Sequence, residues 1–287
     1  MNVFKILLCD IKEGTLKNRR FIAAPLIALF VCMLAQIRID FFSDSFELRN
    51  NPTLFNLLIE AFRGSDPLSE VGEMHAPLPY IWLSIFIFSM FTVFDYAHDD
   101  ISNFGMQIIL KTGKRTSWWH SKCIWVMLSG IYYYGLFILT MLGFANMNGY
   151  TMSFKDNTIF SDLLANCSTY YTYKNIEEVT GTELLLFILS PLIVICTLNI
   201  FQVTLSLLIK PLYSFFITLG VLLLSVFVDW TAIFPRTAMM TYSSHYYQNG
   251  YSMKIGWIVC IAVIFASVVI GRIWFKKYDI LPQKNEV

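Results

Sequence analysis

Six long apolar stretches constrain the fold of this 287-residue chain more than any other feature. They cover residues 21–37, 78–94, 123–144, 184–208, 212–230 and 255–274. Each comes close to the roughly 20 residues that a helix needs to cross the hydrocarbon core of a bilayer. Helices are expected because the stretches lack the alternating pattern of barrel strands. With 56% hydrophobic and only 14% charged residues, the chain is predicted to form one all-α, polytopic membrane domain over residues 1–287.

Basic residues predict the orientation of the six transmembrane helices, since Lys and Arg concentrate on the cytoplasmic side. With both termini in the cytoplasm, 14 of the 21 basic residues lie inside and seven lie outside. The extracellular segments are then 38–77, 145–182 and 231–254, and the loop 95–122 is cytoplasmic. The net charge of +1 gives no reason to expect nucleic acid as a partner.

The first 20 residues suggest an amphipathic helix that lies along the inner membrane surface. Phe4, Leu7, Leu8 and Ile11 share one face of a helix, and the opposite face is charged. The alternative is a short lead-in to the first span. Further along, residues 52–62 predict a short outer helix, and residues 231–254 predict short helices that dip into the outer leaflet. A tight turn at Lys210 makes the fourth and fifth spans an antiparallel hairpin.

Groups with catalytic, metal-binding or nucleotide-binding chemistry are not apparent. No ionisable residue lies within the six stretches away from their ends, which argues against an intramembrane enzyme. His98, Asp99, Asp100 and His120 flank one loop but lack the spacing of a metal site, so a solvated charged loop is expected. Residues 113–116 lack the first glycine of a phosphate-binding loop. Four of the six cysteines lie in or beside the spans, so no disulfide framework is expected.

Asn199 and Gln202 are the most polar residues inside the spans. One turn apart, they are expected to hydrogen-bond to neighbouring helices or to backbone. The alternative is contact with a transported substrate. A pathway with so little charge suits an amphipathic or apolar cargo better than an ion.

The loop between the second and third stretches carries a resemblance to a known family. The resemblance lies in residues 95–100, 103–108, 111–115 and 118–122 of this loop. A short turn before the fifth stretch is also similar to that family. With six helices after an amphipathic segment, the chain resembles the type-2 ABC exporter permeases. The resemblance implies a coupling helix that docks on a separate ATPase, which binds the ATP and Mg. The implied coupling residues are Asn103, Phe104, Gly105, Met106, Gln107 and Ile108.

Within that family, the chain looks most like permeases of Gram-positive bacteria that export antimicrobial or cytolytic peptides or give immunity to lantibiotics. The resemblance implies a dimer with an identical or a related permease in the plasma membrane. Alternating access would then move amphipathic peptides outward, with spans one, two and five lining the path. The long acidic first outer loop departs from many relatives. The alternative function is a non-transporting sensor or immunity subunit that binds peptide and signals through a partner.

Overall fold

The computed structural model describes residues 3–45, 52–65, 78–102, 105–107, 109, 115–154, 181–228, 230, 233–240, 242–247, 250 and 252–277. The long helices are α2 (Ala23–Ser45), α4 (Tyr80–Thr92), α7 (Arg115–Met147), α9 (Gly181–Leu208), α10 (Pro211–Phe227) and α11 (Met253–Lys277). The shorter ones are α1 (Val3–Asp10), the π-helix η1 (Ile11–Leu16), the 3-10 helix η2 (Arg19–Ile22), α3 (Leu54–Phe62), α5 (Tyr96–Ser102) and the 3-10 helix η3 (Phe234–Ala238). The described ranges contain no extended strand, and an isolated bridge joins Thr53 and Thr151.

Five helical segments are long and apolar enough to cross a bilayer. They are Arg19–Phe41, Tyr80–Ile101, Arg115–Met147, Gly181–Leu208 and Met253–Lys276. The expectation of an all-helical chain with transmembrane helices is therefore confirmed over the described residues. The sixth expected span coincides with α10, which is apolar but has only 17 residues.

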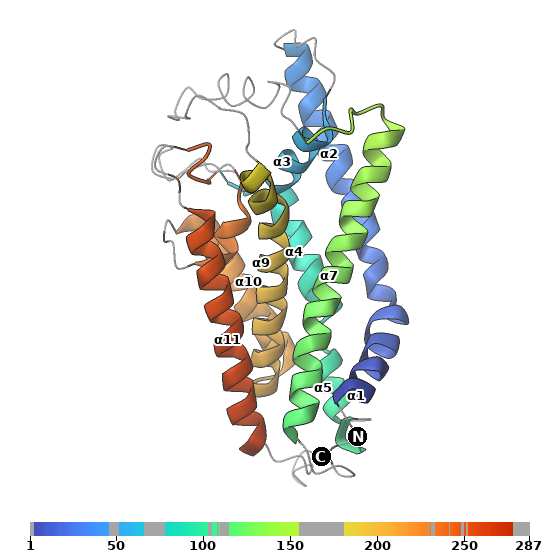
Figure 1. Ribbon diagram of the computed structural model, residues 1–287, viewed down its shortest axis with the longest axis vertical. Coiled ribbons are helices and arrows are strands. Elements are labelled where there is room, and N and C mark those ends of the chain that lie inside the picture. Colours follow the sequence, from blue (N-terminus) through green and yellow to red (C-terminus); the bar gives the residue numbers. More distant parts are fainter. Residues whose placement is uncertain are drawn as a thin grey trace.

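The long helices form an elongated bundle around α9, which packs against α4, α7, α10 and α11 (Figure 1). α1, α5 and the last turns of α11 lie at one end, which we call the inner end, and α3 lies at the opposite, outer end. α9 and α10 form the expected hairpin: Lys210 precedes α10, and Pro211 occupies its first turn, where a missing N–H is tolerated.

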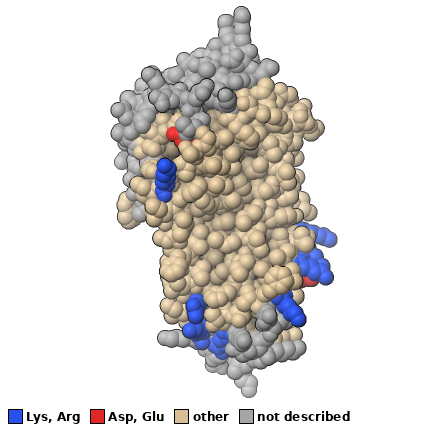
Figure 2. Space-filling view, in the orientation of Figure 1, with Lys and Arg blue, Asp and Glu red and all other residues tan. Residues whose placement is uncertain are grey.

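Apolar side chains cover much of the outside of the bundle. Figure 2 shows a broad band without charged residues between the two ends of the molecule. Exposed apolar side chains of the long helices include Phe30 and Met33 of α2, Phe216 of α10, and Ile261 and Phe265 of α11. A contiguous apolar surface of this kind is stable against lipid rather than water.

The outer end is closed by segments that are far apart in the sequence. The predicted short helix is confirmed as α3, which begins with a capping box between Thr53 and Asn56 and is buried along its whole length. The backbone N–H of Met240, just after η3, donates to the carbonyl of Phe62 at 3.0 Å. The indole of Trp82 in α4 donates to the carbonyl of Ala238 at 3.1 Å. α3 and η3 therefore cap the bundle together. Of the short helices expected in 231–254, the described residues contain this one 3-10 helix, followed by turns.

The N-terminal helix has three faces rather than two. Ile6, Asp10 and Gly14 are buried, and α1 packs along α7. Phe4 and Leu8 from the predicted apolar face stay exposed, as does Lys5 on the charged side. The protein-facing side of α1 therefore carries a carboxylate at Asp10, which the sequence pattern had not singled out.

Candidate functional site

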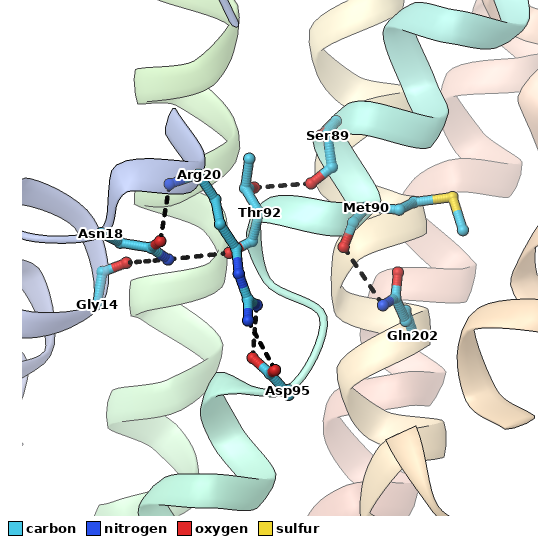
Figure 3. A network of polar contacts seen from close by, with 8 residues as sticks. All are labelled: Gly14, Asn18, Arg20, Ser89, Met90, Thr92, Asp95 and Gln202. Atoms are coloured by element: carbon cyan, nitrogen blue, oxygen red, sulfur yellow. Dashed lines mark hydrogen bonds and ion pairs between the residues drawn. The ribbon is translucent and has the colours of Figure 1, made fainter. Parts of the chain in front are cut away.

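The second predicted span is broken near the inner end, where α4 stops at Thr92 and α5 starts at Tyr96. The last carbonyls of a helix have no partner within the helix, and in a bilayer each unsatisfied carbonyl is costly. Two side chains from other elements supply donors here (Figure 3). Gln202 Nε2 of α9 donates to the carbonyl of Met90 at 3.3 Å, and Asn18 Nδ2 donates to that of Thr92 at 3.3 Å.

An ion pair clamps the same break to the start of the first span. The guanidinium of Arg20 donates two hydrogen bonds to the carboxylate of Asp95, at 2.5 and 2.8 Å. Asn18 orders this corner, because its Oδ1 accepts a hydrogen bond from the backbone N–H of Arg20 at 3.0 Å. Two parallel N–H···O bonds fix direction as well as distance. The start of α2 and the turn between α4 and α5 are therefore held in one orientation.

The two amides singled out from the sequence both lie between α9 and α4. Asn199 Nδ2 donates to Ser89 Oγ at 3.1 Å, and Gln202 makes the bond to Met90 described above. Both side chains are fully buried. Gln202 Oε1 has no hydrogen-bond partner among the described residues. The structure thus places both amides in helix-to-helix contacts.

A cluster of buried charges lies beside the break and joins α1, α5 and α7. Lys122 of α7 is completely buried, with its Nζ 2.5 Å from Asp10 Oδ1 and 2.8 Å from Asp100 Oδ2. We call Asp10, Asp100 and Lys122 the inner triad. Ordinary surface ion pairs contribute little, but a buried charge without its partner is strongly destabilising.

Neutral donors complete the hydrogen bonding of the inner triad. Asp10 accepts hydrogen bonds from Ser121 Oγ at 3.0 Å and from the Tyr96 hydroxyl at 3.1 Å. Asp100 accepts one from the indole of Trp118 at 2.7 Å. The ammonium of Lys122 also lies 4.6 Å from the ring centre of Tyr96, within cation–π range. Burial raises the pKa of Asp10 above its usual value, and the neighbouring Lys122 opposes that shift.

The expectation of a solvated charged loop is wrong for Asp100 and holds for Asp99. Asp99 is exposed, whereas the side chain of Asp100 is only 10% exposed and paired with Lys122. The predicted cytoplasmic loop 95–122 includes Lys122, yet this residue lies two turns inside α7. Sequence reasoning missed the triad because Lys122 and Asp10 are 112 residues apart. One usable signal was the position of Asp10, one turn after Ile6 on the packed face of α1.

An acidic cavity of about 520 Å³ opens next to the inner triad. Asp10, Glu13, Asp99 and Asp100 contribute to its lining, and Lys12 is the only basic residue among the described residues that line it. The described residues contain no group of three or more side chains placed to hold a metal ion. The cavity can therefore receive a basic side chain more readily than an acidic one.

The predicted coupling residues fall only partly within the described chain. Asn103, Phe104 and Ile108 lie outside the described residues, while Gly105, Met106 and Gln107 are helical. Gly105 is buried so tightly that an added Cβ would collide with Asp100 and with the indole of Trp118. Gln107 is exposed. The described part of this segment therefore packs directly on the inner triad and keeps one side accessible.

Comparisons with known proteins add no family to this geometry. No family model matches the chain, and neither a curated protein nor a solved structure is significantly similar to it.

Proposed function

We propose that this chain is the transmembrane permease subunit of an ATP-driven exporter of the type-2 ABC class. In this proposal it binds no nucleotide, metal or cofactor itself, and a separate cytoplasmic ATPase hydrolyses ATP. The resemblance of the loop 95–122 to that family suggests the proposal. The geometry of the inner end supports it in the following way.

The proposal rests mainly on one observation: two separate groups of ion pairs attach the loop 95–122 to the predicted membrane-spanning helices. The inner triad ties α5 to α1 and α7, while the pair of Arg20 and Asp95 ties the same loop to the start of α2. Gln202 then links the end of α4 to α9. Because packed elements move as rigid bodies, a push on the loop would be transmitted to four spans together. An ATPase that docks on this loop could use the attachment to drive alternating access.

Six spans follow if α10 also crosses the membrane. Its 17 residues extend about 26 Å at 1.5 Å per residue, slightly less than a hydrocarbon core of about 30 Å. It has no Asp, Glu, Lys or Arg, and a modest local thinning of the bilayer accommodates such a mismatch. With six spans, both termini lie on the same side, and the basic residues place that side in the cytoplasm. A Gram-positive plasma membrane is the proposed location.

An amphipathic peptide is the proposed cargo. α4 and α10 contain no Asp, Glu, Lys or Arg, and those of α7 and α9 lie within the first eight residues of each helix. The middle of these helices carries hydroxyls and the amides of Asn199 and Gln202. A strongly charged sugar or a metal ion would meet no partner there, at a cost of several kcal/mol. The transporter would be a dimer with an identical or a related permease, and the apolar outside would face lipid.

A sensor subunit is the second candidate function, and a cavity at the outer end favours it. This cavity of about 660 Å³ has Leu186, Phe187 and Met253 as its apolar lining. Its polar side holds a hydrogen bond between His245 Nδ1 and Glu183 Oε1 at 2.9 Å, next to Lys254. A site of this size could bind part of a peptide from outside. The protein would then signal to a partner without moving the peptide.

Site-specific cross-linking combined with transport measurements tests the proposal. A photoreactive residue at exposed Gln107 should capture an ATP-hydrolysing protein in native membranes, and the same residue at exposed Lys254 should not. Proteoliposomes that contain both proteins should then move a fluorescent amphipathic peptide only when ATP is present. Capture without ATP-dependent movement would favour the sensor. If Gln107 captures no ATP-hydrolysing protein, the exporter assignment is wrong.

A further inference from the structure

A second cluster of charged side chains lies at the outer end, around the buried Glu60, and borders a cavity of about 230 Å³. Glu60 of α3 is buried, with Arg63 Nη1 3.4 Å from its Oε1 and Arg38 Nε of α2 3.5 Å from its Oε2. We call Arg38, Glu60 and Arg63 the outer triad. It places two guanidinium groups and one carboxylate beside the cavity.

The outer triad offers both an anion site and an acceptor that lacks a donor. The two guanidinium groups suit a phosphate or a carboxylate, for which arginine is the preferred partner. Glu60 Oε2 is buried and has no hydrogen bond among the described residues, although Arg38 Nε lies 3.5 Å from it. A buried carboxylate oxygen without a donor is unfavourable, so the cavity is suited to a ligand that brings an N–H group as well.

The start of α4 adds further positive potential on the same side. Ile81 and Trp82 of the first turn line the cavity, and no side chain caps this helix end. The first N–H groups of a helix have no partner within it and attract anions. The cavity therefore favours an anionic group near Arg38 and a cationic donor near Glu60.

The depth of Arg38 places the cavity at the outer surface of the membrane. Arg38 lies 19 residues after Arg19 along a nearly continuous helix, which corresponds to about 28 Å. That distance is close to the roughly 30 Å thickness of the hydrocarbon core. The side chain of Arg38 is 37% exposed, and exposed Ile37 and Phe41 adjoin it on α2. The cavity is thus accessible at the depth where lipid headgroups lie.

We infer that the outer triad binds the headgroup of a phospholipid that carries a phosphate and a primary ammonium. The phosphate would accept hydrogen bonds from Arg38 and Arg63, and the ammonium would donate to Glu60 Oε2. Such a zwitterion would complete the hydrogen bonding of the outer triad while leaving its net charge unchanged. The inference is independent of the proposed export function, since it involves neither an ATPase nor a cargo.

Native mass spectrometry of the purified full chain tests this inference. The delipidated protein is mixed with equal amounts of phosphatidylethanolamine, phosphatidylcholine and phosphatidylglycerol with identical acyl chains. Ethanolamine lipid should bind about tenfold more tightly than choline lipid, whose quaternary nitrogen has no N–H to donate. Equal binding of these two lipids to the unmodified protein would overturn the inference.

Two variants and one control assign any preference to the outer triad. Glu60→Gln should abolish the preference for ethanolamine over choline and favour the anionic glycerol headgroup. Arg38→Gln, at a partly exposed position, should weaken binding of all three lipids, and Lys254→Gln should change nothing. An unchanged preference in well-folded Glu60→Gln would contradict the site. If soluble glycerophosphoethanolamine displaces the lipid at equal concentration, a soluble ligand rather than a lipid is the occupant, and the inference is wrong.

Discussion

The inner and outer triads are both charge clusters around a buried central residue, Lys122 and Glu60, yet they differ in sign and in completeness. The inner triad has two carboxylates around Lys122, and Ser121, Tyr96 and Trp118 donate to those carboxylates. The outer triad has two guanidinium groups around Glu60, one oxygen of which lacks a hydrogen bond among the described residues. A fully hydrogen-bonded buried network is rigid, whereas the unpartnered oxygen of Glu60 is the basis of the ligand site that we infer. We propose two different roles for these two clusters: coupling at the inner end and ligand binding at the outer end.

The largest expected effect on stability comes from removing the ammonium group of Lys122, and it tests this comparison of the two triads. Lys122→Met leaves two buried carboxylates uncompensated, and the loss of one partner from a buried pair costs about 3–5 kcal/mol. Thermal unfolding of the purified protein in detergent should show a large decrease in the midpoint, or the protein should fail to accumulate.

The matched change in the outer triad is Arg38→Met. Arg38 is partly exposed and Glu60 keeps Arg63, so the loss should stay within about 0–1 kcal/mol. Lys12→Met, at an exposed position of η1, provides the control for removal of a lysine near the inner cavity. Equal effects of Lys122→Met and Arg38→Met on the unfolding midpoint would refute the distinction between a rigid inner triad and an outer triad that is open to a ligand.

Two glycine-to-alanine substitutions should have smaller effects on stability. They compare the close packing at the inner triad with the open surroundings of the outer half of α7. Gly105→Ala adds a methyl group against Asp100 and Trp118, and overpacking of this kind costs about 1–3 kcal/mol. Gly143→Ala, where the added methyl meets nothing within 4 Å, should instead stabilise α7 by up to about 1 kcal/mol. Circular dichroism during thermal unfolding measures both. A neutral Gly105→Ala would show that the inner loop is not packed on the triad as described.

Hydropathy predicted most of the helices because an apolar run is sufficient evidence for a helix in a membrane. The stretches 184–208 and 255–274 match α9 (Gly181–Leu208) and α11 (Met253–Lys277) closely. Hydropathy predicted a wrong helix boundary where a helix continues past charged residues. α7 starts at Arg115 rather than near residue 123, since Lys122 is neutralised by carboxylates from other elements. Such pairing over long sequence separations is invisible to a local pattern.

Side-chain roles were less predictable than helices. Asn199 and Gln202 stood out from the sequence because amides are rare within apolar spans, and their partners Ser89 and Met90 lie on α4. Arg20 and Asp95 did not stand out, since each lies in a polar flank where a charge is expected. Their pairing depends on the break in the second span, and no proline or glycine occurs between residues 92 and 96 to signal it.

The central claim is that the inner end transmits work from an ATPase to the spans, and coupling efficiency measures this most directly. Proteoliposomes with the captured ATPase allow peptide moved and ATP hydrolysed to be measured together. Arg20→Glu replaces the ion pair with Asp95 by two carboxylates that repel each other. The variant should lower the amount of peptide moved per ATP at least about tenfold while hydrolysis continues. The exchanged pair, Arg20→Glu with Asp95→Arg, should restore much of that ratio. An unchanged ratio in well-folded Arg20→Glu, or peptide movement that does not depend on ATP, would contradict the account.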